Sequence, residues 1–221
     1  MRIIFWILSL IILISCSHNQ DDRTVPPCDK NCTTVQGKFL TENWKVPVAG
    51  MNVSLEWALV GELGGSVRQI ATTKTDNEGF YSFSFYIEDH ELTEGLFIIN
   101  FKTPNNSFLK PIYPYFKFGI NKRDTVINYD YLLPKQSYIK IIVDRQTSNY
   151  DYLLCNVMYC AGDGMVVCDE LDSRKENQKI VETAGNQYTY LQIIKNKGEQ
   201  RSFIKDSIMV YLNDTAAYYI K

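Results

Sequence analysis

The chain has 221 residues, 45% of them hydrophobic, and a formal net charge of −2 from 23 basic and 25 acidic side chains. This composition excludes general disorder, and the mixed charges form no basic stripe, which argues against nucleic acid as a partner. The 15 Tyr and 11 Phe beside only 12 Gly favour strands, because aromatic side chains suit a pleated, half-buried surface.

Residues 1–15 have the pattern of a signal peptide. An apolar run from Ile3 to Ile14 follows Met1-Arg2 and is too short to span a bilayer comfortably. The run ends in Leu13-Ile14-Ser15-Cys16, which resembles the bacterial lipobox. The resemblance implies cleavage before Cys16 and several acyl chains on that residue, which together anchor a protein durably in a membrane. An ordinary secretory signal with a chance cysteine is the alternative.

Residues 16–33 are expected to form the lipidated start and a flexible tether. Ser17, rather than Asp, follows Cys16, and by similarity to the sorting rule of diderm lipoproteins this predicts the outer membrane. The polar stretch Ser17–Pro27 predicts an extended linker. Gln20-Asp21-Asp22 resembles the acidic export signals of Bacteroidetes lipoproteins, and a plain solvated linker is an equal alternative. The protein is therefore expected on the periplasmic face of the outer membrane or on the cell surface.

Residues 34–133 carry the clearest strand pattern of the chain. Apolar and polar side chains alternate from Met51 to Leu59, as expected for a strand with one face in a core. Glu88–Gly95 predicts a loop or one helical turn, and the prolines in Lys110–Phe116 predict an irregular edge. The remaining strands are predicted from Val35 to near Glu42 and at Val67–Thr75, Phe80–Ile87, Leu96–Lys102 and Asp124–Leu133.

Asp76-Asn77-Glu78-Gly79 connects two of these strands and predicts a tight turn. Asp and Asn side chains can bond their own backbone there, and Gly accepts a positive φ. Calcium binding by Asp76, Asn77 and Glu78 is the less favoured alternative, because Ca²⁺ takes six to eight oxygen ligands.

The stretch from Gly37 to Phe85 resembles the opening half of carboxypeptidase-regulatory-like and transthyretin-like β-sandwich modules. The resemblance lies in Gly37-Lys38-Phe39, in the Pro/Gly turn at Val46–Gly50, and in the turn and aromatic strand at Thr75–Phe83. It implies a seven-strand sandwich without catalytic residues. A purine-pathway hydrolase shares this fold, but its His set and C-terminal motif do not match the ending Tyr218–Lys221.

Residues 134–221 predict a second small β-rich domain, without a family resemblance and without a repeat that aligns to the first half. The charged segment Leu171–Glu182 predicts a loop or short surface helix. The fold class expected is therefore all-β, with two small antiparallel sandwiches of Ig-like or transthyretin-like type. Strands are predicted at Tyr138–Asp144, Tyr152–Tyr159, Met165–Cys168, Gln187–Lys195, Phe203–Leu212 and Ala217–Ile220.

Five cysteines follow Cys16, and an exported protein meets an oxidising compartment in which disulfides form. Cys28 and Cys32 either close a small loop or clip the tether to the C-terminal half. Cys160 and Cys168 flank a glycine-containing reversal, which predicts a Cys160–Cys168 disulfide. Zinc is disfavoured because the spacings lack a paired C-x2-C and no His accompanies them.

The functional expectation is a non-catalytic, lipid-anchored envelope protein without metal or cofactor. No nucleophile, zinc or phosphate-loop motif is present, although an unrecognised pair of carboxylates stays open as an enzyme hypothesis. Trp44, Tyr113 and Tyr115 fall in predicted loops and are the candidate ligand-facing aromatics. The expected partners are the membrane, through the lipid, and an envelope protein or glycan in an uptake or adhesion complex. A subunit of a pilus-like or fimbria-like fibre is the alternative.

Overall fold

The computed structural model describes residues 28–221 except 62–63, 112 and 145–149. The predicted all-β fold is confirmed: these residues form β1 to β16 and one 3₁₀ helix, η1 (His90–Leu92), inside the segment predicted as a loop or helical turn. No helix of the described part is long and apolar enough to cross a membrane.

The first nine strands build a sandwich of two sheets. One sheet holds β2, β1 and β5, with β8 and β9 paired to β1, and the other has the order β4-β3-β6-β7. Their bounds are β1 (Thr33–Thr41), β2 (Val46–Pro47), β3 (Asn52–Gly61), β4 (Gly64–Lys74), β5 (Phe80–Phe85), β6 (Leu96–Phe101), β7 (Tyr115–Phe118), β8 (Val126–Asn128) and β9 (Tyr131–Leu132).

The remaining strands build a second sandwich. Its small sheet has the order β13-β10-β16, and its large sheet has the order β12-β11-β14-β15. Their bounds are β10 (Gln136–Val143), β11 (Tyr152–Ala161), β12 (Gly164–Asp172), β13 (Gln178–Ala184), β14 (Gln187–Lys197), β15 (Gln200–Val210) and β16 (Thr215–Ile220).

The two sandwiches share one topology, which the sequence did not reveal as a repeat. In each, the first strand lies between an antiparallel neighbour (β5 or β13) and a parallel last segment (β8–β9 or β16). The large sheets correspond strand for strand, and each carries a register shift between its first two strands, β3–β4 or β11–β12. The chain therefore repeats one architecture with different side chains.

The two cores differ in chemistry. The first is rich in aromatic rings, with Phe39 5.0 Å from Phe101 and 5.4 Å from Tyr81 between ring centroids. The second is mainly aliphatic and includes Ile139, Leu153 and the thiol of Cys155. In both cores the buried side chains alternate along the strands, so the period of two in the sequence marks the inward faces.

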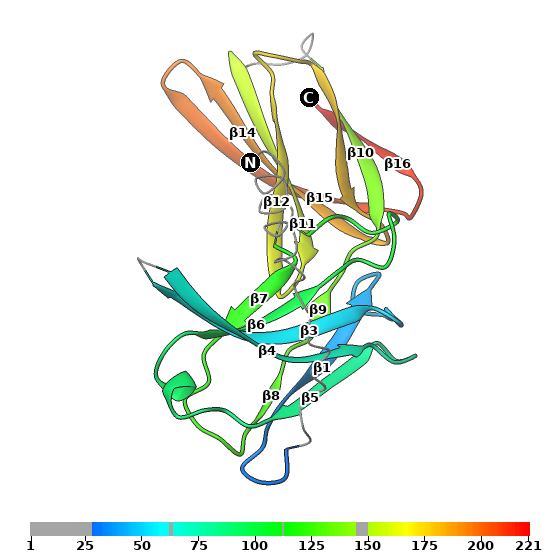
Figure 1. Cartoon of the computed structure of the whole chain (residues 1–221). Helices are drawn as coiled ribbons and strands as arrows, with labels where there is room; N and C mark the ends of the chain where they lie inside the picture. The colour runs from blue at the N-terminus through cyan, green and yellow to red at the C-terminus, as the bar shows by residue number, and fades with distance from the viewer. Residues whose placement is uncertain (1–27, 62–63, 112, 145–149) are drawn as a thin grey trace, which may run out of the picture.

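The sandwiches lie end to end in Figure 1 and are joined by direct bonds. Leu132 and Gly162 exchange backbone hydrogen bonds of 3.2 and 2.8 Å across the junction. Glu42 accepts hydrogen bonds from Lys135 (2.6 Å) and from Asn186 (2.9 Å), and these bonds lower the pKa of its carboxyl group. Besides the covalent connection, the junction is therefore held by a backbone pair and by the hydrogen bonds of Glu42 to Lys135 and Asn186, which we call the Glu42 clamp.

Two predicted segments are wrong in detail. Leu171–Glu182 was expected to be a loop or helix, but β12 runs to Asp172 and β13 begins at Gln178. The charged residues mark the solvent side of edge strands, which tolerate charge. Asp124–Leu133 was expected as one strand, but it is divided into β8 and β9.

Gly37 explains this division, because the chain between β8 and β9 crosses directly over it. A Cβ at residue 37 would lie 1.8 Å from the carbonyl oxygen of Tyr129. Tyr129 also donates its backbone N–H to Gln36, and Asp130 accepts the backbone N–H of Lys38. Only a residue without a side chain fits this approach.

The substitution Gly37→Ala should lower the free energy of unfolding by about 2–3 kcal/mol, the usual scale of an overpacked site. Urea unfolding of the full-length chain measures it. Gly119→Ala is the matched control, because a Cβ there meets nothing within 4 Å, and it should leave stability nearly unchanged. Equal effects of the two changes would contradict the role given to Gly37.

Candidate functional site

Part of the predicted site lies outside the described residues. The signal peptide, the lipidation residue Cys16 and the tether as far as Pro27 belong to this part, so Cys16 stays a prediction. The described chain begins beside a disulfide between Cys28 and Cys32, which closes the small loop proposed from their spacing.

The three candidate aromatics lie at two different places. Trp44 is 41% exposed and lies in a turn in which Glu42, Asn43 and Trp44 all have positive φ, a conformation that costs non-glycine residues energy. Tyr113 is 64% exposed, and its ring centroid lies 5.8 Å from that of Tyr115 at the start of β7. The structure therefore brings the two tyrosines together, and no contact among the described residues joins Trp44 to them.

The predicted Cys160–Cys168 disulfide does not form, and both thiols are free. The chain does reverse between them, but the register of β11 and β12 pairs Cys160 with Met165. Cys168 lies three residues further on, about 10 Å along the strand, which is beyond the reach of a disulfide. Its thiol donates instead to the carbonyl of Val157, at 3.1 Å.

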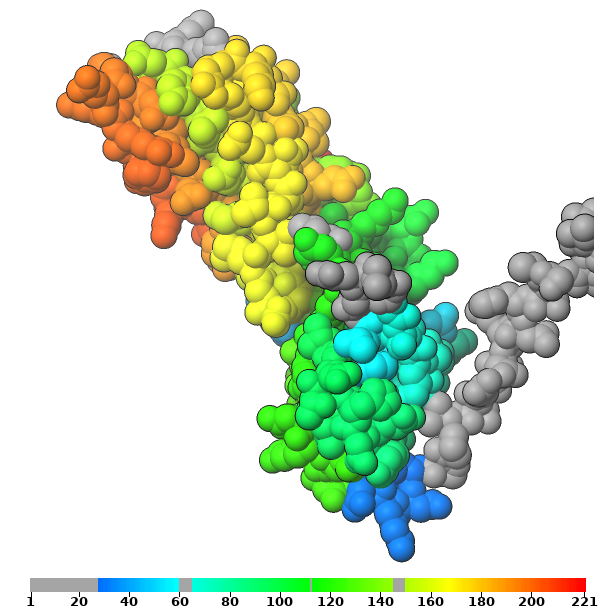
Figure 2. Space-filling view, turned by 60° about the vertical axis from the view of Figure 1, so that its left-hand side comes forward, coloured from blue at the N-terminus to red at the C-terminus, as the bar shows by residue number. Residues whose placement is uncertain are grey.

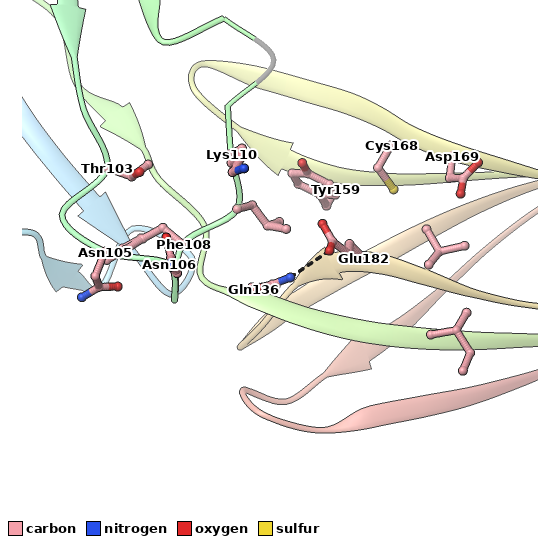
Figure 3. Close-up of a pocket in the computed structure, with 13 residues that line it drawn as sticks. Thr103, Asn105, Asn106, Phe108, Lys110, Gln136, Tyr159, Cys168, Asp169 and Glu182 are labelled. Carbon is pink, nitrogen blue, oxygen red and sulfur yellow. Dashed lines mark hydrogen bonds between the residues drawn. The ribbon is translucent and has the colours of Figure 1, made fainter.

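A pocket of about 670 Å³ lies between the sandwiches, shown in Figure 3. The loop from Thr103 to Lys110 lines one side, and strands of the second sandwich line the other. Glu182 accepts a hydrogen bond from Gln136, at 2.9 Å, and Asp169 is paired with Lys179 at 2.8 Å. These carboxylates therefore already have partners.

The pocket offers no activated nucleophile. Burial raises the pKa of Cys168 to about 11 and that of Tyr159 to about 12, so both groups are protonated at neutral pH. No His is among the described residues that line it, so the thiol has no basic partner there. The pocket supplies hydrogen-bonding groups at a junction and gives no support to catalysis by Cys168.

The most distinctive surface is an apolar patch on the outer face of the large sheet β12-β11-β14-β15. Alternate residues of β11 and β14, such as Leu153 and Leu191, point into the core, so their neighbours point outward. Met165 is 53%, Val167 56% and Tyr188 52% exposed. We name the patch the methionine–tyrosine face; it consists of Met158, Cys160, Met165, Val167, Tyr188, Tyr190 and Met209.

Strand register makes this face continuous. Val167 pairs with Met158, which pairs with Tyr190 on its other side. Met165 pairs with Cys160, and Tyr188 pairs with Met209, at the end of the sheet nearer the β11–β12 turn. Figure 2 shows these strands side by side on one flank of the second sandwich, with no part of the first sandwich over them.

A polar row borders the face. Glu170 on β12, Asn156 on β11, Gln192 on β14 and Lys205 on β15 follow one another across the sheet. The side-chain amide of Asn156 donates to Gln192 at 3.2 Å. An acidic and a basic side chain, both exposed, therefore stand at the two edges of one row.

The matching sheet of the first sandwich has a different surface. Its outward rows mix Gln69, Glu56, Ile98 and Lys117 in one line, and Thr72, Ser54, Asn100 and Tyr115 in the next. A third row, Val67, Ala58 and Leu96, is apolar, with Val67 66% and Leu96 44% exposed. Two adjacent apolar rows that span four strands therefore distinguish the second sandwich from the first.

Sequence reasoning missed this face, although one signal was present. The segment Tyr152–Ala161 is apolar at most positions on both of its faces, as expected of a strand covered on both sides. Its neighbours on the face come from three other strands, and only the register brings them together.

No family model matches the chain, and no curated protein matches its sequence. Among solved structures it is similar to the Bacillus anthracis TIE protein, at 12% identity over 86% of this chain and 34% of that one, with a TM-score of 0.35. It is also similar to a streptococcal ancillary pilin, at 13% identity over 86% of this chain and 63% of that one, with a TM-score of 0.33. It is similar as well to the shaft pilin SpaA from Lactobacillus rhamnosus GG, at 7% identity over 85% of this chain and 96% of that one, with a TM-score of 0.35.

The chain spans about a third of the length of the first of these proteins and less than two thirds of the second. Likenesses at these identities and TM-scores carry no argument about function.

The protonated state of Cys168 can be tested by alkylation. With a pKa of about 11, about one thiol in a thousand is ionised at pH 8, so iodoacetamide should react slowly and faster as the pH approaches 11. Peptide mass spectrometry of the native chain measures the rate, with the urea-unfolded chain as control. A Cys160–Cys168 cross-linked peptide, or half-maximal alkylation near pH 8.5, would contradict the structure.

Proposed function

We propose that this chain is a non-catalytic protein of the bacterial outer membrane, anchored by lipid on Cys16, that works by binding another protein. The observation that carries the proposal is the methionine–tyrosine face. Soluble monomers rarely expose large contiguous apolar patches, and those that do commonly bind a partner there. Met and Tyr are enriched in the buried centres of protein interfaces, whereas Lys and Glu are depleted.

The chemistry of the face favours a protein over a glycan. Sugar hydroxyl groups need hydrogen-bonding partners, and three Met and one Val of the face offer almost none. Tyr113 and Tyr115 supply rings suited to sugars, but they form an isolated pair on the first sandwich. Burial of the apolar side chains by a partner protein is the larger source of free energy.

The place where the described chain begins supports this proposal. The described chain begins at the end of the first sandwich that is far from the second, as the blue segment of Figure 2 shows. A lipid tether leading to that end would place the second sandwich farthest from the membrane. The methionine–tyrosine face would then stand where a neighbouring protein can reach it.

A structural subunit of a pilus-like fibre is the second candidate, favoured by the edge strand β15. This strand has 11 residues, pairs only with β14 among the described strands, and is exposed at eight consecutive positions. Unpaired edges of this kind can accept a strand from a neighbour. However, the Tyr218 hydroxyl donates to Asp206 and connects β16 to this edge, so the edge is partly closed.

The binding proposal predicts site-specific cross-linking in living cells. A photoreactive phenylalanine analogue at Tyr188, on the face, should give a covalent adduct with a partner protein. The same analogue at Tyr219, which is 63% exposed on β16 of the small sheet, is the matched control and should give little. Absence of an adduct at Tyr188, or equal adducts at both positions, would reject the proposal.

The fibre candidate predicts a ladder of detergent-resistant multimers when cells are lysed without boiling, because strand insertion forms continuous backbone hydrogen bonds. Immunoblotting of the untreated and boiled samples measures it. Monomers alone in the unboiled sample would reject this candidate and leave the binding proposal standing.

A further inference from the structure

We propose that the partner of the methionine–tyrosine face is a second copy of this chain, bound face to face about a twofold axis parallel to β11 and β14. The proposal rests on the proposed function, because it identifies the partner for the same surface. It is carried by the distribution of apolar and charged side chains over the four strands.

A twofold axis in the plane of the sheet can run parallel or perpendicular to the strands. The two directions differ in which side chains of the two copies they bring together. An axis parallel to the strands, between β11 and β14, places each row against the same row of the other copy. Met165 then faces Met209 of the second copy, and Met158 faces Tyr190 of the second copy. The two rows of the face therefore meet each other, with Val167 opposite Ser207 of the second copy and apolar side chains at the other positions.

The same axis places opposite charges together. Strand β12 of one copy lies over β15 of the other, so Glu170 faces Lys205 of the second copy, and the symmetry repeats the pair. Neither side chain forms an ion pair within the described chain, and both are exposed. Within one copy they are separated by three strand spacings, about 14 Å, which is too far for a direct pair.

An axis perpendicular to the strands lacks this charge pair. It would place each strand over the same strand of the other copy, so Glu170 on β12 would not face Lys205 on β15. Opposite charges are brought together only by the parallel axis, which is therefore favoured.

The favoured axis is also compatible with anchoring in one membrane. Figure 1 shows the strands of the second sandwich running roughly along the line that joins the two sandwiches. A twofold axis in that direction keeps the chain starts of both copies at the same end. Two copies tethered to one membrane can therefore pair side by side, and the shared membrane raises their effective concentration.

The size of the face predicts a weak dimer in solution. The two rows of the face and the polar row, each across four strands, cover roughly 400 Å² on each copy, so about 800 Å² is buried in total, below the usual size of stable interfaces. We expect a dissociation constant on the order of micromolar for the free chain.

A charge-swap series on the full-length chain in detergent tests the proposal by analytical ultracentrifugation. Lys205→Glu and Glu170→Lys each replace two attractive contacts by two repulsive ones and should weaken the dimer about tenfold. The double variant, with both changes, should return to nearly the wild-type affinity. Because the two residues cannot meet within one copy, this recovery would come only from contact between copies.

A second pair of variants tests the apolar rows. Val167→Glu should abolish the dimer, whereas Val67→Glu, at a 66% exposed position on β4 of the first sandwich, should leave it unchanged. Thermal unfolding should be similar for all variants, which confirms that folding is preserved.

A wild-type chain that stays monomeric at about 100 µM, or a double variant no better than the single ones, would overturn the dimer. The mass of the Tyr188 adduct separates this failure from that of the proposed function. An adduct of a different protein would reject self-association and leave protein binding in place, whereas no adduct would reject both.

Discussion

The pairing of the first strand of each sandwich on both of its edges is the constraint on which the structure depends. β1 lies between β5 and the β8–β9 segment, and β10 lies between β13 and β16. A strand bonded on both sides has a fixed register, and a fixed register decides which alternate side chains enter the core. The inward residues are then determined by packing, and the outward residues of the large sheets are left free to differ.

This division explains what could be predicted from the sequence. The alternation of Met51, Val53 and Leu55 marks an inward face whatever the strand pairs with, so β3 was predicted correctly. β13 was missed because Gln178, Lys179 and Glu182 conceal a short inward pair, Val181 and Thr183. Local pattern is therefore sufficient where the core dominates a segment and insufficient at charged edges.

Features that depend on the register between strands could not be predicted from the sequence. The reversal at Ala161–Gly164 was recognised, yet the pairing of Cys160 with Met165 separates the thiols that the reversal seemed to join. Gly37 was placed in a strand, but the approach of the Tyr129 carbonyl arises from residues far along the chain. The methionine–tyrosine face also depends on register. Four strands contribute to it, and the residues that lie side by side in each row come from different strands.

The contrast between the two large sheets assigns different roles to the sandwiches. Both sheets have the same strand order, so any apolar surface that the topology itself required would occur on both. The second sheet has two adjacent apolar rows across four strands, whereas the first has one shorter row, Val67, Ala58 and Leu96, beside mixed polar rows.

The junction supports this assignment. The Glu42 clamp and the backbone pair Leu132–Gly162 hold the second sandwich against the end of the first, opposite the start of the described chain. A first sandwich that serves as a rigid spacer and a second that presents the contact surface account for both observations.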